Sequence, residues 1–212
     1  MKNSEKYIRL LNLFLGALLL FICAVRISGT RISAEDNWKG YAVYRDGVIT
    51  SNFNVNDHAA IMYKSNKGYP DTVIHAGGYG YGVEFADWER FIANREFISA
   101  YKPNGCNMVA YRNQFASKTR ELIGISYTVL NQITYYAGEE SRVFPEYISD
   151  IRCDGVVEYI YEWYGFRVGG PNSRWNITIN HPGNYSAHQG FSITPHKQRE
   201  YYLTQVESDL GD

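Results

Sequence analysis

Residues 151–165 constrain the fold most, because they predict a single amphipathic helix within an otherwise mixed chain. Its apolar positions recur at the spacing of one helix face: Val156, Val157, Ile160 and Tyr164. Asp154 in the first turn and Gly165 after the last suit the two ends of the helix dipole and a glycine C-cap. We therefore expect a helix that begins at Cys153.

A cysteine at a helix N-terminus is a candidate nucleophile. Unpaired N–H groups and the positive end of the dipole favour the thiolate, and the neighbouring Arg152 adds to that effect. The alternative is that Cys153 is a small buried apolar residue. The first interpretation predicts a lowered pKa for Cys153 and a faster reaction near neutral pH than that of Cys106.

Residues 1–34 differ from the rest of the chain and read as a secretory signal peptide or a membrane anchor. Basic residues precede residues 10–25, an apolar run interrupted only by Asn12. The run is short for a spanning helix but close to the required ~17 to 25 residues. Ala34 is a candidate cleavage position with a poorly matching Ile32 before it, so cleavage and anchoring both stay open. Residues 35–212 are predicted to form one exported domain.

Composition excludes some functions. The chain has a formal net charge of −1, and five of its basic residues lie in residues 1–34, so the remainder is acidic and nucleic acid is not an expected partner. Cys106 and Cys153 are too few for a disulfide framework, although one bridge between them stays open. His181, His188 and His196 lack metal-ligand spacing, so we expect solvated loop histidines, no metal and no cofactor.

Periodicity and turn residues outline an α+β domain. A strand or short hairpin is expected around a turn at residues 45–47, and residues 126–150 are expected to be irregular. Further strands are expected at residues 58–63, 72–76 and 97–101, an edge strand at 175–179, and helices at 87–92 and 108–122.

Three segments together resemble the permuted branch of the NlpC-type, papain-like cysteine hydrolases, which includes lecithin–retinol acyltransferase-like enzymes and bacterial envelope hydrolases. Residues 57–63, DHAAIMY, resemble the "SHVGIYLG" strand of that branch. Residues 72–76, TVIHA, resemble its next strand, "VIEA" or "VAH". Residues 120–127, RELIGISY, followed by CDGVV at 153–157, resemble its "REQLGKPY…CSELV" passage.

The resemblance implies a circularly permuted papain-like fold, with an antiparallel sheet packed against helices. It implies Cys153 as nucleophile and His58 as base, within hydrogen-bond reach of each other, and His75 as the residue that orients the base. Glu84 is the alternative orienting residue. Tyr127 would donate its hydroxyl to the oxyanion, unless it is a core aromatic residue.

The sequence departs from the family pattern at three places. Ser126 replaces the usual Pro before Tyr127, and the loop between the two histidine strands is longer. Asp154 replaces the usual Ser after the cysteine, and a carboxylate beside a thiolate raises the pKa of the thiol.

Three functions remain open at this stage. The first is an exported, cell-envelope cysteine hydrolase that cleaves an amide bond in peptidoglycan peptides through a thioester. The second uses the same chemistry on a lipid acyl group, which an uncleaved anchor at residues 10–25 would favour. The third is a binding module that kept the fold without the activity.

Overall fold

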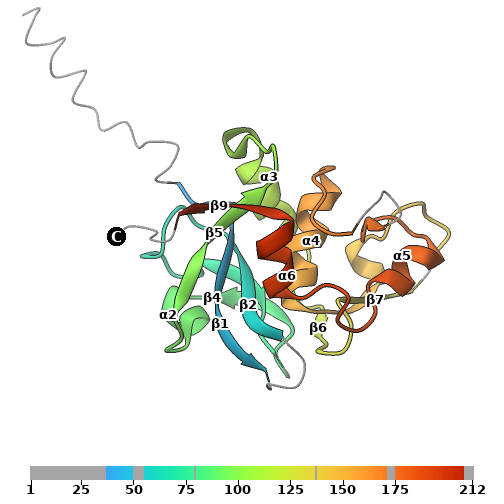
Figure 1. The fold of residues 1–212 in the computed structure, drawn as a ribbon, viewed down its shortest axis with the longest axis horizontal. Coiled ribbons are helices and arrows are strands. Elements are labelled where there is room, and N and C mark those ends of the chain that lie inside the picture. Colours follow the sequence, from blue (N-terminus) through green and yellow to red (C-terminus); the bar gives the residue numbers. More distant parts are fainter. Residues whose placement is uncertain (1–36, 50–54, 79, 137, 171–174, 208–212) are drawn as a thin grey trace, which may run out of the picture. The chain divides into compact units, whose positions relative to one another are not determined.

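The structure, a computed structural model, describes residues 37–49, 55–78, 80–136, 138–170 and 175–207. Its main element is a six-stranded sheet in the order β4-β3-β2-β1-β5-β9, in which neighbouring strands are antiparallel (Figure 1). The strands are β1 Ala42–Ile49, β2 Val55–Met62, β3 Val73–Ala76, β4 Val83–Ala86, β5 Phe97–Pro103 and β9 Leu203–Glu207. A smaller sheet, β6-β8-β7, contains β6 Ser126–Tyr127, β8 Ile148–Ile151 and β7 Ile133–Tyr135.

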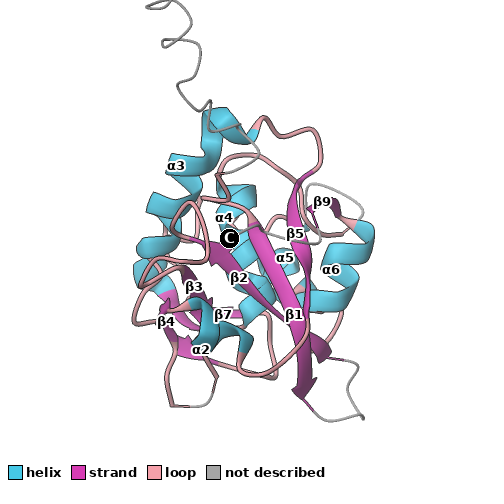
Figure 2. Ribbon diagram, turned by 90° about the vertical axis from the view of Figure 1, so that its left-hand side faces the viewer, coloured by secondary structure: helices cyan, strands magenta, loops and turns pink. Residues whose placement is uncertain are grey.

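Helices cover both faces of the large sheet. α2 lies on one side of it, and α4 and α6 lie on the other (Figures 1 and 2). The helices are α2 Trp88–Ile92, α3 Met108–Arg120, α4 Cys153–Trp163, α5 Pro182–Ala187 and α6 Pro195–Tyr201, with a 3₁₀ turn at Pro145–Tyr147. The domain is therefore α+β, with an antiparallel sheet packed against helices, as the sequence predicts.

α4 is buried on all sides. Each of its residues from Cys153 to Glu162 is buried, because the helix packs against β2, β3, α3 and α6. Its two tyrosine hydroxyls keep partners inside the protein: Tyr159 donates to the Val143 carbonyl at 2.8 Å and Tyr161 to the Gly40 carbonyl at 3.0 Å. The sequence predicted the start and the apolar face of this helix correctly, but not its complete burial.

The side chain of Tyr44 identifies which residues of the large sheet face α4 and α6. The Tyr44 hydroxyl donates to Gln198 Oε1 of α6 at 2.6 Å, and Gln198 Nε2 donates to the Asp154 carbonyl of α4 at 3.0 Å. Tyr44 stands opposite Ala59 across β1 and β2. Because residues opposite each other in antiparallel strands share a face, Ala59 also faces α4.

Of the strand or short hairpin expected around residues 45–47, the strand is confirmed, whereas the turn there and the edge strand at residues 175–179 are not. The turn expected at residues 45–47 lies inside β1, which continues past it and loses register with β2 between Asp46 and Ile49. The short pairing beyond Asp46 resembles a bulged strand end rather than a hairpin. Residues 175–179 do not form a strand either, since only an isolated bridge joins Ile179 to Arg142.

The sequence analysis also missed regular structure in two regions. Residues 126–150 supply most of the small sheet, with strands too short to show an alternating pattern. The chain end contains α5, α6 and β9, and β9 completes the large sheet beside β5. Pro182 and Pro195 each begin a helix, which is a position where proline is common.

The described residues belong to one unit, Ala34–Asp212. The predicted signal or anchor at residues 1–34, including the apolar run 10–25, lies outside the described part of the chain. None of the described helices has the length and apolarity needed to cross a membrane.

We predict that Gly155→Ala destabilises the fold by about 3 kcal/mol or more, at the upper end of overpacking effects. A Cβ at Gly155 would lie 2.3 Å from the Gln132 carbonyl oxygen and 2.8 Å from Ile151 Cγ1. That carbonyl is held by the Arg152 N–H at 3.0 Å and cannot easily move away. Gly165→Ala is the matched control, because its only cost is a left-handed φ of +84, about 1 kcal/mol. Equal losses in urea unfolding would contradict this packing argument.

Candidate functional site

Cys153 is the first residue of α4, as expected for the candidate nucleophile. Its side chain is buried, with 2% exposure. Burial raises the pKa of the thiol to about 12, the charge of Asp154 adds to this, and the backbone N–H groups of Ala59 and Asp154 oppose it together with Arg152. The expected lowering of the pKa is therefore wrong, because burial and the adjacent carboxylate outweigh the helix N-terminus.

The expected difference in reactivity between the two thiols loses its basis for the same reason. Cys106 and Cys153 are both free, so no disulfide joins them. Burial also raises the pKa of Cys106, to about 11. Both thiols are thus protonated near neutral pH, and neither is a ready nucleophile without a base.

Arg152 opposes the raised pKa of the Cys153 thiol, as the sequence suggested, and it also holds the chain around the start of α4. It is fully buried and pairs with Asp154 through two contacts, Nε to Oδ1 at 2.7 Å and Nη2 to Oδ2 at 2.9 Å. Its other hydrogen bonds go to the carbonyls of Val129, Gly190 and Ile193. A bidentate guanidinium–carboxylate pair with its remaining donors satisfied is the arrangement that makes a buried ion pair tolerable.

His58 and His75 lie side by side on β2 and β3. His58 Nε2 and His75 Nδ1 are 2.7 Å apart, a hydrogen bond, and both rings contact Phe91 of α2. Burial lowers the pKa of both imidazoles; His75 and then Arg45 act in the same sense on His58, and the pKa of His75 falls to about 4. Both rings are therefore neutral near pH 7, which is the state that a general base requires.

The two histidines and the thiol lie on different faces of the sheet. His58 stands opposite Arg45 across β1 and β2, and both side chains contact Phe91 on the α2 face. Ala59 faces α4 on the other side, where its backbone N–H lies at the Cys153 thiol. Within the described residues no hydrogen bond joins Cys153 Sγ to His58. The structure thus brings the two histidines together but leaves the nucleophile and the base without a direct contact.

Backbone pairing between β2 and β3 stops short of the two histidines. The ladder ends at the pair of Ile61 with Ile74. Beyond this pair, the hydrogen bond between the rings of His58 and His75 joins the two strands.

Glu84 occupies the position that determines the tautomers of the pair. It stands opposite His75 across β3 and β4, with Oε1 4.0 Å from His75 Nε2, and it is hydrogen-bonded to Arg90. His75 Nε2 is buried and has no hydrogen-bond partner in the described chain. A proton on that nitrogen, facing the carboxylate, leaves His75 Nδ1 as acceptor, His58 Nε2 as donor and His58 Nδ1 with its lone pair free. His58 Nδ1 is then the basic atom.

Tyr127, the candidate oxyanion donor, is half-buried at the end of β6. It lines a pocket of about 300 Å³ together with His58, Arg45 and Arg95. The pocket brings Tyr127 and His58 to one space, whereas Cys153 is not among its lining residues. The roles of Tyr127 as donor and as core aromatic residue are both compatible with this position.

The sequence analysis missed a polar cluster behind the thiol. Glu158 Oε1 is 3.0 Å from His188 Nε2, and Glu158 Oε2 accepts from Gln132 Nε2 at 2.6 Å. His188 is 2% exposed, so the expectation of a solvated loop histidine is wrong for it, whereas His181 and His196 are exposed. Burial opposes the charged ring, but Glu158, the Asn184 carbonyl and Asp154 together raise the pKa of His188.

The signal for this cluster is present in the sequence. Asp154, Glu158 and Glu162 are spaced by four residues, which places three carboxylates on one face of an otherwise apolar helix. Glu162 is buried and accepts from the backbone N–H groups of Ile177 at 2.7 Å and Val168 at 3.3 Å. A row of carboxylates with this spacing predicts buried hydrogen-bond partners as readily as it predicts a solvent-exposed helix face.

Within the described residues no group of three or more His, Cys, Asp or Glu side chains is arranged to hold a metal ion. The comparisons with known proteins found no matching family model, no matching curated protein and no matching solved structure.

We predict that His75 makes the fold sensitive to acid. Its pKa is about 4 in the folded protein against ~6.5 unfolded, so the unfolded chain binds more protons between these values and stability falls as the pH drops from 6.5 to 4. The loss should reach about 3 kcal/mol at most, and His75→Asn should remove most of it in urea unfolding. The exposed His181→Asn is the control. An unchanged pH slope in His75→Asn would contradict the assignment of a buried neutral ring.

Proposed function

We propose that the chain is a cysteine hydrolase of the permuted, papain-like NlpC type, which cleaves an amide bond through a thioester on Cys153. One observation carries the proposal: Cys153 begins a buried helix beside β2, and the adjacent strands β2 and β3 hold a hydrogen-bonded pair of neutral histidines. Along the chain, the proposed base comes first, the orienting residue second and the nucleophile last, which is the order in the permuted branch.

The proposed chemistry starts from a neutral thiol and a neutral imidazole. His58 Nδ1 takes the thiol proton as Sγ attacks the carbonyl carbon, and His58 later gives that proton to the leaving amine. Water then attacks the thioester with His58 again as base, which releases the acid and restores the thiol. The N–H groups at the thiol and the hydroxyl of Tyr127 are the donors available for the oxyanion.

Catalysis in this form requires His58 to turn toward the thiol. The end of the β2–β3 ladder supports that step, because backbone pairing stops short of both histidines. The thiol already lies at the backbone N–H of Ala59, the residue next to His58. A side-chain rotation during substrate binding is therefore the movement that the proposal needs, and unliganded sites often have such loose geometry.

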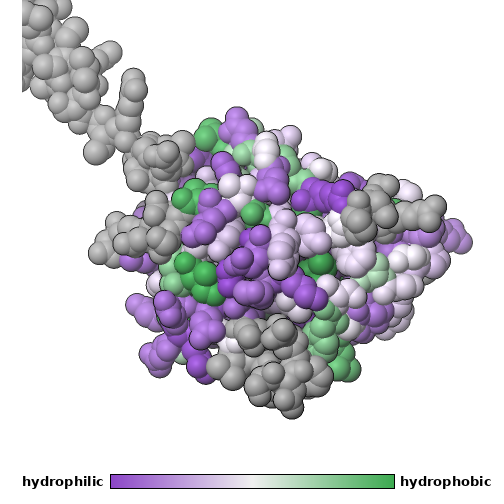
Figure 3. Space-filling model, viewed as in Figure 1, coloured by the Kyte–Doolittle hydropathy of each residue, from purple (hydrophilic) through white to green (hydrophobic). Residues whose placement is uncertain are grey.

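The proposed substrate is a peptidoglycan stem peptide at the cell envelope of a bacterium. An exported or anchored domain, which the pattern of residues 1–34 favours, meets such peptides outside the cytoplasm. The alternative substrate is a lipid acyl group, with attachment to the membrane through residues 10–25. Figure 3 shows hydrophilic and hydrophobic residues interspersed on the face of the domain that it draws.

A binding module of the same fold is the second candidate, and one observation favours it. The Cys153 side chain is 2% exposed, and its pKa of about 12 keeps the thiol protonated. A ligand-binding protein that retained these residues for packing alone would look the same. Only a measurement of turnover separates the two candidates.

We predict that Cys153→Ala abolishes hydrolysis of defined peptidoglycan fragments, with a loss of at least about a thousandfold, because the covalent step disappears. His58→Asn should lose a similar factor, since members of one catalytic unit fail together. Cys106→Ala, at the other buried free thiol, is the matched control. Products are followed by mass spectrometry, and a thioester should be trapped on Cys153. Equal product formation by Cys153→Ala and the unsubstituted chain would refute Cys153 as the nucleophile, and no product above background from the unsubstituted chain would leave the binding module as the function.

We predict a separate effect for the orienting residues. His75→Ala and Glu84→Gln should leave the melting temperature nearly unchanged and lower turnover by roughly 10- to 100-fold, as outer partners of a reactive ring do. Glu84→Gln should also change the tautomers of His58 and His75 in ¹⁵N NMR spectra. Glu89→Gln, an exposed glutamate on α2, is the control. A lowered melting temperature with full turnover per folded molecule would show that His75 only packs.

A further inference from the structure

Two arginines line the pocket beside His58. Arg45 and Arg95 both line it, and the pocket has a volume of about 300 Å³. Asp57 also lines it, but its carboxylate is held by Arg199 Nε at 2.5 Å. The carboxylate in the lining is therefore already paired with another cation.

The two guanidinium groups keep unused donors. Arg45 Nε is buried without a hydrogen-bond partner among the described residues, while its Nη1 donates to the Asp46 carbonyl at 2.8 Å. The side chain of Arg95 makes no hydrogen bond or ion pair with another described residue. Burial lowers the pKa of Arg45; Cys153 and Asp46 act in the opposite sense, whereas the charge of Arg95 lowers the pKa further. A buried donor without a partner costs stability, which a bound acceptor would restore.

The backbone before Arg95 is itself unusual. Ala93 and Asn94 have φ values of +49 and +60, so two consecutive residues without the freedom of glycine take the left-handed conformation. This turn ends α2 and leads directly to Arg95, and Ala93 lines the same pocket. Such strain persists where the surroundings require it, often at binding sites.

We propose that this pocket binds an oxyanion, a carboxylate of a peptide substrate, between Arg45 and Arg95. The forked donors of arginine match the two oxygens of a carboxylate, and the volume suits a group of amino-acid size. The hydroxyl of Tyr127 and the ring of His58 line the same space, so the bound group would lie beside the base. The assignment of this carboxylate to the substrate rests on the hydrolase proposed above. The binding of a carboxylate in the pocket does not rest on it.

The test measures binding by isothermal titration calorimetry with the full chain in detergent. N-acetyl-L-alanine offers a free carboxylate, and its methylamide offers the same shape without the charge. We expect only the acid to bind, and Arg45→Gln and Arg95→Gln each to weaken it roughly tenfold or more, because hydrogen bonds to charged groups are strong. Arg45→Lys, which keeps the charge and loses the fork, should give a smaller loss.

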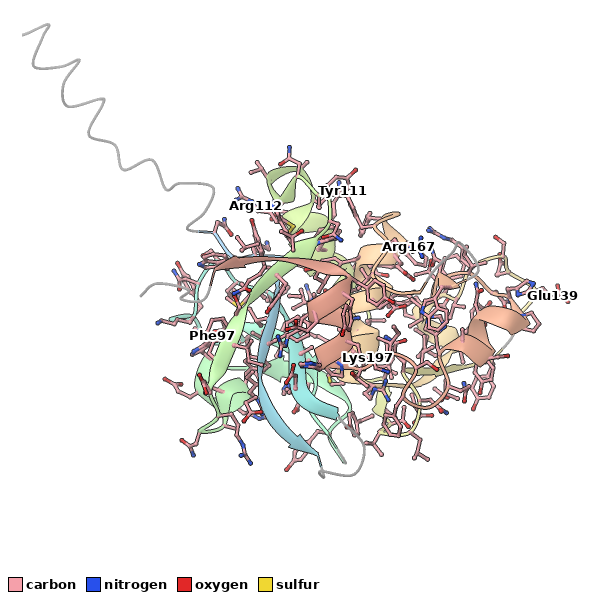
Figure 4. All side chains as sticks on the ribbon, viewed as in Figure 1. Phe97, Tyr111, Arg112, Glu139, Arg167 and Lys197 are labelled. Atoms are coloured by element: carbon pink, nitrogen blue, oxygen red, sulfur yellow. The ribbon has the colours of Figure 1, made fainter. Side chains whose placement is uncertain are left out.

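The control is Arg112→Gln. Arg112 lies on α3 (Figure 4) and is not among the residues that line the pocket. Arg95 is exposed, so its variant should fold even if those of Arg45 do not. Equal binding of the acid and the methylamide, or an unchanged affinity in Arg95→Gln, would overturn the oxyanion site.

A third ligand identifies the source of the oxyanion. Glycerol 3-phosphate presents the phosphate of a lipid headgroup. If it binds more tightly than the acid and its binding depends on both arginines, the oxyanion site stands and the peptide assignment fails.

The result is also separable from the proposed hydrolase. Arginine-dependent binding with no Cys153-dependent turnover would refute the hydrolase alone, and turnover without such binding would refute the oxyanion site alone.

Discussion

Three buried carboxylates fix α4 to the chain segments around it, and they belong to Asp154, Glu158 and Glu162. Each is buried, and each has partners outside the helix: the Arg152 guanidinium, His188 with Gln132, and two backbone N–H groups. Removing one partner would leave a buried acceptor or charge unsatisfied, at a cost of about 3 to 5 kcal/mol for an ion pair. These three contacts therefore fix where the second sheet and the chain end lie against the helix.

The first of these carboxylates, that of Asp154, also influences the protonation of the candidate nucleophile, Cys153. Asp154 pairs with Arg152, whose remaining donors bind three loop carbonyls. The carboxylate of Asp154 adds to the raised pKa of Cys153, and the charge of Arg152 opposes it only in part. A helix N-terminus alone cannot offset both effects, since its contribution is about 0.3 to 2 kcal/mol. What stabilises the position of the sulfur thus suppresses its ionisation, and a base becomes necessary for any chemistry.

The sequence predicted the parts of the fold that have a strong local signal. The helix at Cys153 follows from its apolar spacing, and the strands of the two histidines follow from compact apolar runs between turns. The small sheet has strands of two to four residues, too short for any period. The pairing of His58 with His75 follows from adjacent strands, whereas the pocket with Arg95 depends on a left-handed turn that no local pattern shows.

The end of the β2–β3 ladder links these observations. Backbone pairing ends at Ile61 and Ile74, and beyond this pair a hydrogen bond joins the imidazoles of His58 and His75. That bond is worth about 1 kcal/mol net, far less than the ion pairs that fix α4. The base is consequently the element of the site that can move at small cost, and the nucleophile is the one that cannot.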